Sequence, residues 1–560
     1  MLELTDRDAA GRICKWTVGK HVITTPNICI VVNPNKLTVP IAELKSEFKA
    51  DILITNSYII RRSDRLRPLA EAGLHKMLGW NGPIYTDSGT FQMYSQGTVE
   101  VGPDEIIDFQ KKIGSDIITP LDMFTRPADD LKTAKANLTE TVKRIKAARS
   151  SVDGSLVGPI QGGRFLDLRK KACKEVAKLN PDVFAIGGIV PFMEQYRYRE
   201  LADIILTCKN ELPSHTPIHA FGAGHPMVFA FLASLGCDIF DSAMYSLAAE
   251  RGAYLTVSGT RQLSELKEFP CSCPLCSHSE PKNILALPEA ERKSWLARHN
   301  LYATFEELRT VRQAIRENSL WELVQERARA HPALLEALIF ALKNHSKILL
   351  RLDSASKKSA LMWSGSETAL RPEVVRARAS LKSMKAKGVV KKEPFGSVPA
   401  ALMHVYPFGQ SVTPDAPKFK LAKPEDVVRT TVRYQYGSEL KTKCLNIEVS
   451  RMTGMIRRVW KGKALLGTIR PHDGFFLPTM EGAKLIKMKK VVINDADAAK
   501  YVSDGRSLFA KFVSKAEDIV PGEEVAVYHK KDIIAVGSAQ LSGKEMKEMK
   551  RGIAVSVRAS

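Results

Sequence analysis

Two aspartates far apart in the chain, Asp87 and Asp241, each end a short apolar run typical of a β-strand. A core strand gains nothing from a carboxylate at its end, so we interpret both as residues that bind or react. If the two strands lie in one sheet, both carboxylates can face one space. Paired carboxylates suit chemistry at the anomeric carbon of a sugar, where one attacks as a nucleophile to give a covalent glycosyl intermediate and the other handles the proton.

Other strand-like runs also end in polar residues or glycines, which supply donors and acceptors suited to the edge of a purine. Two aromatic residues near such ends, Phe91 and Phe221, can stack on the faces of a base. Taken singly, an aspartate is more often a loop or helix cap, and a phenylalanine is more often part of the core. The polar and glycine candidates for the base edge are Asp122, Gln161, Gly187 and Gly188.

Three cysteines crowd into the sequence CSCPLC, whereas the other six of the chain's nine cysteines are scattered. This arrangement indicates a reduced compartment and a metal instead of a disulfide framework. Cys271, Cys273 and Cys276, together with His299, would form a closed tetrahedral site for a structural zinc ion. His278 lies too near to Cys276 to complete the tetrahedron comfortably. The alternative is three buried free thiols.

Eight apolar runs alternate with charged segments of helical period between residues 20 and 242. Strand alternating with helix predicts a parallel sheet, and eight such units are what a (β/α)8 TIM barrel requires. The alternative is an open, doubly wound sheet. In a barrel, functional residues lie at the C-terminal ends of the strands, and a candidate residue ends each of the last six runs. The runs are HVITTPNICIVV, DILITNSYII, GPIYTDSG, SDIITPLD, SLVGPIQGG, DVFAIGG, PIHAFGAG and CDIFDSA.

The 560-residue chain has 83 Lys and Arg against 61 Asp and Glu, a formal net charge of +22. This excess makes a polyanion the first partner to consider. No apolar run approaches the roughly 18 residues of a membrane span, and the start MLELTDRDAAGR lacks the form of a secretion signal. We therefore expect a cytoplasmic protein that binds nucleic acid and does not bind a membrane.

The last third of the chain differs in composition from the barrel. Seven Lys or Arg and no acid lie between Arg376 and Lys392, a run that is either a solvated linker or helix face or an arm that contacts phosphates. From Val491 onward, short β-like runs resemble a PUA domain, a small β-barrel RNA-binding module. Residues 491–560 hold eleven Lys or Arg and ten Asp or Glu, so such a module would bind RNA by shape and specific contacts.

Six short motifs, taken in their order along the chain, resemble those of the tRNA-guanine transglycosylases, specifically the archaeal, archaeosine-forming kind. Thr90 stands where the bacterial form usually has a second glycine, which favours the archaeal branch. Six ordered motifs are far more specific than any one of them, and the resemblance covers nearly the whole chain. The motifs are TDSGTFQ at 86–92, PLDMF at 120–124, IQGG at 160–163, IGGIVP at 186–191, FGAGHP at 221–226 and FDSA at 240–243.

The resemblance implies that a guanine at position fifteen, in the D-loop of tRNA, is exchanged for 7-cyano-7-deazaguanine. By similarity, Asp241 would attack the ribose carbon, expel guanine and hold the tRNA covalently until the incoming base displaces it. Asp87 would take the proton that the incoming base loses, and Ser88 would shape the site. The family's zinc pattern also points to His299, and the family implies a homodimer.

For the base itself, the resemblance places its edge against Asp122, Gln161 and Gly188, with Phe91 on one face and Phe221 on the other. The PUA domain would grip the acceptor end of the tRNA. The expected architecture is a TIM-barrel domain with a zinc-binding insertion, followed by small α+β domains and a PUA domain. The expected ranges are 1–348 for the barrel domain, with the zinc subdomain at about 271–299, then 349–412, 413–486 and, for the PUA domain, 487–560.

Three other functions compete with this one. A paralogue of the same fold could perform the later conversion of the cyano group, but such relatives tend to lose the paired aspartates or the zinc cysteines. A non-catalytic RNA-binding protein built on a decayed barrel would have no use for Asp87 and Asp241. Queuine-type specificity is opposed by the additional C-terminal domains.

Overall fold

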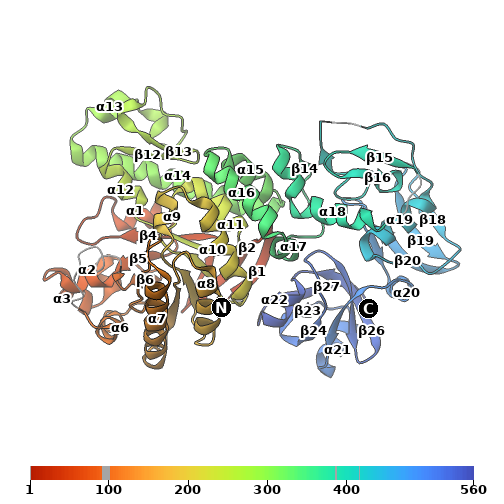
Figure 1. Ribbon diagram of the computed structural model, residues 1–560, viewed down its shortest axis with the longest axis horizontal. Coiled ribbons are helices and arrows are strands. Elements are labelled where there is room, and N and C mark those ends of the chain that lie inside the picture. The colour runs from red at the N-terminus through yellow and green to blue at the C-terminus, as the bar shows by residue number, and fades with distance from the viewer. Residues whose placement is uncertain (1, 91–100, 385–387, 415–416) are drawn as a thin grey trace. The chain divides into compact units, whose positions relative to one another are not determined.

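The computed structural model describes almost the whole chain, and contacts divide it into two compact units (Figure 1). The barrel unit consists mainly of Gly11–Ile315 and Leu323–Ala341. The C-terminal unit consists mainly of Arg316–Glu322 and Leu342–Ser560, and it includes Arg7–Ala10. The described residues are 2–90, 101–384, 388–414 and 417–560.

Eight parallel strands close into a barrel, which confirms the predicted fold class. They follow one another around the barrel in chain order, and β11 closes it by pairing with β4. This register places Asp87 beside Asn56 and Asp241 beside Cys29. Each predicted run contains one strand of the barrel. The strands are β4 (Asn27–Val32), β5 (Leu53–Asn56), β6 (Ile84–Asp87), β7 (Ile117–Ile118), β8 (Ser155–Ile160), β9 (Val183–Ile186), β10 (Ile218–Ala220) and β11 (Ile239–Ser242).

Helices form in the segments between the strands, and most of these segments carry one stripe of buried apolar side chains, whereas the helix at residues 226–234 is apolar and buried on all sides. In α7, buried side chains recur every three or four residues, and Asp130 caps the helix by accepting a hydrogen bond from the amide of Thr133 at 2.8 Å. The helices of this region are α1 (Ile41–Ser46), α2 (Ser57–Arg62), α3 (Leu66–Glu71), α4 (Leu74–Leu78), α6 (Pro103–Lys112), α7 (Leu131–Ser151), α8 (Leu166–Ala177), α9 (Val190–Glu194), α10 (Tyr198–Glu211) and α11 (Pro226–Ser234).

A three-stranded sheet that the sequence analysis did not predict covers the N-terminal end of the barrel. The predicted run HVITTPNICIVV contains both the last strand of this sheet and β4, with Pro26 between them. Trp16 and Val18 of the sheet belong to the same buried cluster as Ile54 and Val157 from the barrel strands. This end of the barrel is therefore closed by apolar packing. The sheet consists of β1 (Leu2–Asp8), β2 (Gly11–Val18) and β3 (His21–Thr24).

The segment after β11 forms a small subdomain before the chain returns to long helices (Figure 1). A hairpin, β12 (Ala253–Thr256) and β13 (Gly259–Gln262), precedes the cysteine-rich loop, and the long helix that carries His299 follows it. The helices are α12 (Met244–Glu250), α13 (Pro281–Leu285), α14 (Glu289–Glu317), α15 (Leu320–Ala328) and α16 (Pro332–Asn344).

The C-terminal unit ends in a six-stranded sheet, whose strands in spatial order are β23 (Leu508–Phe509), β27 (Ile553–Ala559), β26 (Asp532–Ala539), β25 (Glu524–His529), β22 (Lys489–Ile493) and β24 (Val513–Ala516). One hydrophobic cluster contains both Val428 and Leu466 and, from the final sheet, Ala526 and Val536, so these segments share a core. The predicted division at 349–412, 413–486 and 487–560 stays a prediction. In the described parts of the chain, no helix is long and apolar enough to cross a lipid bilayer.

Among the described residues of this unit, the other strands form three smaller sheets, two of two strands and one of four. The strands of the unit are β14 (Leu361–Met362), β15 (Val389–Lys392), β16 (Gly396–Pro399), β17 (Ser411–Val412), β18 (Asn446–Val449), β19 (Ile456–Lys461), β20 (Ala464–Ile469), β21 (Phe476–Pro478), β22 (Lys489–Ile493), β23 (Leu508–Phe509), β24 (Val513–Ala516), β25 (Glu524–His529), β26 (Asp532–Ala539) and β27 (Ile553–Ala559). Its helices are α17 (Ser346–Leu352), α18 (Pro372–Lys382), α19 (Pro424–Tyr436), α20 (Met480–Ala483), α21 (Ala496–Ser503) and α22 (Gly543–Glu548).

Candidate active site and metal centre

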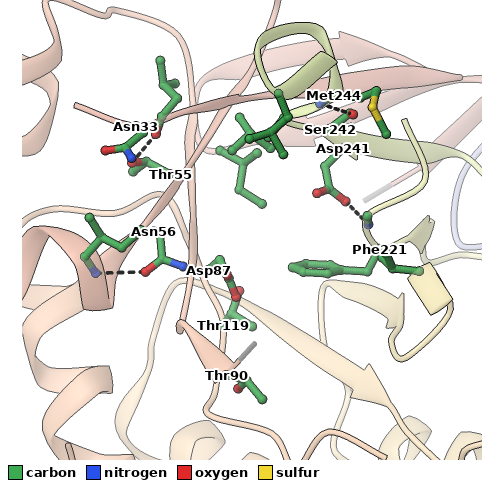
Figure 2. A pocket seen from close by; sticks show the side chains of 18 of the residues that line it. Asn33, Thr55, Asn56, Asp87, Thr90, Thr119, Phe221, Asp241, Ser242 and Met244 are labelled. Carbon is green, nitrogen blue, oxygen red and sulfur yellow. Dashed lines mark hydrogen bonds between the residues drawn. The ribbon is translucent and has the colours of Figure 1, made fainter. Parts of the chain in front are cut away.

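A cavity of about 480 Å³ lies at the C-terminal ends of the barrel strands (Figure 2). In a TIM barrel this is the end where active sites form, because the loops that can vary emerge there. Most of the residues predicted from strand ends meet in this one space. Those that line it are Asp87, Asp122, Gln161, Gly187, Gly188, Phe221 and Asp241.

Asp241 is held by one of its two carboxylate oxygens. Nε2 of His219 lies 2.7 Å from Oδ1, and the amide of Gly222 donates to the same oxygen at 2.5 Å. Because an ionised carboxylate only accepts hydrogen bonds, Nε2 carries the hydrogen, and Nδ1 can accept from the hydroxyl of Tyr85, 3.3 Å away. No hydrogen bond from the described residues reaches Oδ2 of Asp241. That oxygen keeps its lone pairs for a ligand.

Asp87 approaches the same space from β6. Oδ2 accepts a hydrogen bond from Nδ2 of Asn56 at 2.9 Å, and Asn56 is itself fixed because its Oδ1 caps α2, accepting from the amide of Ile59 at 3.0 Å. The pKa of Asp87 is raised to about 7. Burial is the largest cause, and the nearby carboxylates of Asp122 and Asp241 raise the pKa as well, while hydrogen bonds from neighbouring backbone amides lower it. A carboxyl group with this pKa can both donate and accept a proton near neutral pH.

Asp122, Gln161 and two glycines form one wall of the cavity. Nε2 of Gln161 donates to Oδ2 of Asp122 at 2.6 Å, while Oε1 of Gln161 is buried and receives no hydrogen bond from the described residues. A Cβ at Gly187 would lie 2.5 Å from Nε2 of Gln161, so only glycine leaves room for that side chain. Gly188 has a φ of +67°, in the left-handed region that favours glycine. The wall thus presents backbone and an unused acceptor to a ligand.

Phe221 is the aromatic residue that lines the cavity as predicted. Its ring centroid lies 4.8 Å from that of His219, and Figure 2 shows the ring pointing into the space between Asp87 and Asp241. Ser88 is fully buried, and its hydroxyl oxygen lies 3.3 Å from that of Thr90. The predicted stacking residue Phe91 lies outside the described residues.

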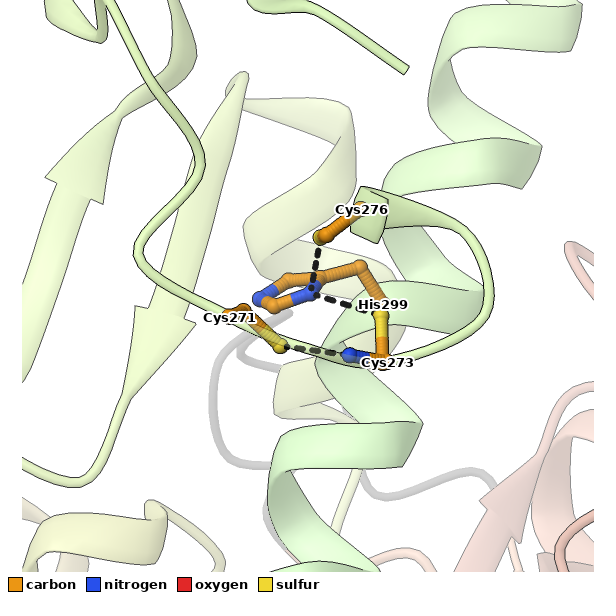
Figure 3. Close-up of side chains that lie close together, drawn as sticks. All are labelled: Cys271, Cys273, Cys276 and His299. Carbon is orange, nitrogen blue, oxygen red and sulfur yellow. Dashed lines mark hydrogen bonds between the residues drawn. The ribbon is translucent and has the colours of Figure 1, made fainter. Parts of the chain in front are cut away.

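The four predicted metal ligands come together in the subdomain after β11 (Figure 3). The ligand atoms of Cys271, Cys273, Cys276 and His299 all lie within 4.8 Å of one another. Nε2 of His299 lies 3.0 Å from the backbone oxygen of Leu255, so Nε2 donates there and the lone pair of Nδ1 faces the sulfur atoms. This donor set can hold one metal ion.

Comparison with known proteins identifies the family of the chain. The family model described as Queuine tRNA-ribosyltransferase matches residues 6–333. A relative from Methanococcus aeolicus named tRNA-guanine(15) transglycosylase is 37% identical, over 100% of both chains. Relatives of the same name from Methanocaldococcus jannaschii and Pyrococcus abyssi are 38% and 41% identical, over 99% of this chain and 98% and 97% of their own. The chain belongs to the tRNA-guanine transglycosylase family.

The match to the transglycosylase family extends beyond the barrel. The model described as patch-forming domain C2 of tRNA-guanine transglycosylase matches residues 426–490, and the PUA domain model matches residues 489–560. The resemblance predicted from six motifs is thereby confirmed, including the PUA domain and the archaeal branch, since these full-length relatives are archaeal.

The basic run between Arg376 and Lys392 is in part structural in this transglycosylase. Arg376, in α18, donates to the backbone oxygens of Leu350, Asp353 and Ser354 at 2.8 to 2.9 Å. Nζ of Lys392, which is buried, donates to a backbone oxygen at 2.5 Å. Nε of Arg378 likewise donates to the backbone oxygen of Pro394 at 2.7 Å. These three side chains are engaged within the C-terminal unit, so the phosphate-contacting alternative is left to the other basic residues of the run.

Three residues that support the site were not singled out from the sequence, although each carried a signal. Asn56 is the last residue of the second barrel strand, the same position that Asp87 has in the third. Tyr85 and His219 each precede a strand-end candidate, Asp87 or Phe221, by two residues. Because side chains alternate along a strand, this spacing places each of them on the face of its candidate.

Proposed function

We propose that the chain is a tRNA-guanine(15) transglycosylase, a pentosyltransferase that replaces the guanine at position fifteen of the tRNA D-loop by 7-cyano-7-deazaguanine, in archaeosine biosynthesis. The observation that carries the proposal is the single cavity in which Asp87 and Asp241 meet the groups predicted to bind a base edge. The name of the relatives, tRNA-guanine(15) transglycosylase, supports guanine as the base that is replaced and fifteen as its position in the tRNA. The incoming base rests on the family resemblance.

In the first half-reaction, Oδ2 of Asp241 forms a bond to C1′ of the ribose while the bond from C1′ to N9 of guanine breaks. The electron pair of the broken bond leaves with guanine, and the tRNA remains attached to Asp241. His219 and Gly222 support this role because both hold Oδ1 and leave Oδ2 available. The departing base takes a proton from Asp87.

In the second half-reaction, the incoming base uses N9 to attack C1′, and the bond to Asp241 breaks. The base must lose the hydrogen on N9, and Asp87, now ionised, accepts it. Asp87 thus returns to its protonated form, as the reverse of the first half-reaction requires. A pKa of about 7 suits a group that alternates between these two states at neutral pH.

We infer that the metal is one structural zinc ion. Bond lengths of about 2.3 Å to sulfur and 2.0 to 2.1 Å to nitrogen put the two kinds of donor roughly 3.6 Å apart in a tetrahedron. The sulfur atoms of Cys273 and Cys276 lie 3.7 and 3.3 Å from Nδ1 of His299, which fits this spacing. Four protein ligands, with Cys271 as the fourth, leave no open position for water, so the ion would stabilise the subdomain without taking part in the reaction.

The proposed macromolecular substrate is tRNA, and several features support it. The net charge of +22 favours a polyanion, and the PUA match gives a module of a known RNA-binding class. We also propose, from the family, a cytoplasmic homodimer whose C-terminal domains span 349–412, 413–486 and 487–560. The small-molecule partners are guanine and 7-cyano-7-deazaguanine.

The alternative is a paralogue of the same fold that binds tRNA without catalysis or acts in a later step. Two features oppose it. Asp87 and Asp241 both line the cavity, and the full set of metal ligands is gathered at one point. A protein that had lost the exchange reaction would have no reason to keep, in a shared cavity, two carboxylates that form no ion pair with a lysine or arginine of the described residues.

The decisive experiment incubates the purified protein with labelled guanine and unmodified tRNA and then locates the label. The proposal expects incorporation at position fifteen, and it expects unlabelled 7-cyano-7-deazaguanine to prevent it. Label at another position, or binding of tRNA with no incorporation, would contradict the proposal and favour the tRNA-binding paralogue.

A further inference from the structure

A buried arginine lies behind the wall of the cavity that is proposed to bind the base. Arg169, in α8, is 0% exposed, and the sequence analysis did not single it out. Its Nε donates to the backbone oxygen of Gly163 at 2.9 Å, and its Nη1 donates to those of Ile160 and Gly187 at 2.6 and 2.9 Å. One guanidinium therefore ties together the turns that follow β8 and β9.

Arg169 has no carboxylate partner among the described residues, unlike other fully buried arginines of the chain. Arg12 is paired with Asp238 and Arg371 with Glu373. The ionisable neighbours that act on the pKa of Arg169 are the thiols of Cys173 and Cys208, and burial, the larger influence, lowers that pKa. A guanidinium stays protonated in proteins even so. The wall therefore encloses a positive charge that forms no ion pair with a carboxylate of the described residues.

This charge is coupled to the cavity through the peptide between Gly187 and Gly188. When Nη1 donates to the oxygen of Gly187, it polarises that peptide and makes the amide hydrogen of Gly188 a stronger donor. Both glycines line the cavity. Nη2 of Arg169 is buried, has no hydrogen-bond partner within the described part of the chain and lies 3.7 Å from where a Cβ of Gly188 would stand. The charge therefore lies directly behind the surface that a base would touch.

We propose that Arg169 is a positioning residue that fixes this wall and, through the Gly187–Gly188 peptide, stabilises the negative charge of the departing base. The inference rests on the proposed transglycosylase function. When the bond from C1′ to N9 breaks, its electron pair passes to the purine, and the charge spreads over the ring until the proton from Asp87 neutralises it. A preorganised donor aimed at the base edge lowers the barrier by stabilising the charge that develops there, and a cation behind the donor that is not paired with a carboxylate strengthens this effect.

The test compares Arg169→Met with Arg169→Lys in the full-length protein. The Met variant removes both the positive charge of the guanidinium and its hydrogen bonds to the three backbone oxygens. We expect it to slow single-turnover formation of the tRNA–protein adduct by about 10²-fold and to raise KM for guanine by about 10-fold. The Lys variant keeps the positive charge but loses the planar arrangement of donors that reaches several backbone oxygens at once, and we expect adduct formation to be about 10-fold slower. The affinity for tRNA, measured separately, should change less than about 2-fold in both, because Arg169 does not face the solvent.

Arg376→Met serves as the matched control, since Arg376 also donates to three backbone oxygens but lies in the C-terminal unit. Its KM for guanine should stay at the wild-type value. The proposal is overturned if Arg169→Met forms the adduct at the wild-type rate, or if Lys and Met slow it equally, which would leave a purely structural role. Should Arg169→Met fail to fold, the Lys variant decides alone, and a wild-type rate and KM there would overturn the proposal. A wild-type protein that exchanges no guanine would instead refute the proposed function itself.

Discussion

The two ends of the barrel use the same residue type in opposite ways, and one strand shows both uses. Asp238, just before β11, is fully buried and accepts two hydrogen bonds of 2.8 Å from Arg12, beneath the N-terminal sheet. Asp241, three residues later in the same strand, faces the cavity. Among the described residues, no lysine or arginine pairs with Asp241, and it is held by a histidine and an amide instead.

The pKa values reflect this difference. Burial alone would raise the pKa of Asp238, but the guanidinium of Arg12 holds it below its ordinary value. Asp87, at the other end, forms no ion pair with a described lysine or arginine, and its pKa is raised to about 7, mainly by burial. The closed end thus contributes stability through a paired charge, while the open end keeps its carboxylates unpaired and available for proton transfer and attack.

The largest effect is expected from Asp241→Asn, which keeps the size of the side chain and removes the nucleophile. Guanine exchange should fall by at least about 10⁴-fold, and no denaturant-resistant tRNA–protein adduct should form. Thermal unfolding and tRNA affinity should stay near wild type. An adduct that persists in this variant would assign the nucleophile to another residue.

The next largest effect is expected from Asp87→Asn, at the end of β6. Loss of the proton-transfer group should slow exchange by about 10² to 10⁴-fold. Binding of tRNA, measured by fluorescence titration, should remain nearly intact because the substitution changes no contact outside the cavity. If tRNA binding is lost together with exchange, Asp87 has a structural role instead.

Asp238→Asn should act on stability and leave the chemistry alone. It leaves Arg12 buried without its partner, so the free energy of unfolding should fall by about 3 to 5 kcal/mol. The folded fraction, measured at a temperature well below its melting point, should exchange guanine with a kcat within about 2-fold of wild type. A fall in kcat at unchanged stability would show that Asp238 takes part in the reaction, and it would contradict the division of roles between the two ends of the barrel.

The pH dependence should differ in sign between the half-reactions because Asp87 must be protonated in one and ionised in the other. With a pKa of about 7, Asp87 is protonated below that pH and ionised above it. Adduct formation should therefore slow as pH rises through about 7, by up to about 10-fold per unit, while base uptake into a preformed adduct should slow as pH falls through it. Rapid-quench assays of each half-reaction measure this, and profiles without these slopes would contradict the role of Asp87.

The smallest effect is expected from Phe221→Leu, which removes a ring from the cavity without changing its charges. Loss of stacking should raise KM for guanine by about 2 to 10-fold and leave kcat unchanged. An effect confined to kcat would show that Phe221 acts on the reacting groups and not on the base.

The barrel and most of its open end were predictable from the sequence because the information is local. Each strand is a short apolar run, and strand direction alone places Asp87 and Asp241 at the same end of a parallel barrel. The candidate metal site was equally accessible, since three of its four residues lie within six residues of one another. These predictions required no knowledge of which residues far apart in the chain contact one another.

What the sequence did not reveal depends on partners distant in the chain. The N-terminal sheet was missed because its third strand and β4 form one uninterrupted β-like run apart from Pro26. Arg12 and Asp238 are separated by 226 residues, and His219 contacts a hydroxyl 134 residues away. Arg169 looks in sequence like one more basic residue on a helix, and only the fold turns it toward the backbone of the cavity wall.

The most direct test of the account maps the covalent adduct in the wild-type protein. The protein is incubated with tRNA, denatured, treated with ribonuclease and protease, and analysed by mass spectrometry for a peptide that carries a ribosyl group. The account predicts that the modification lies on Asp241 alone. A ribosyl group on Asp87, or on any residue outside the cavity, would contradict it.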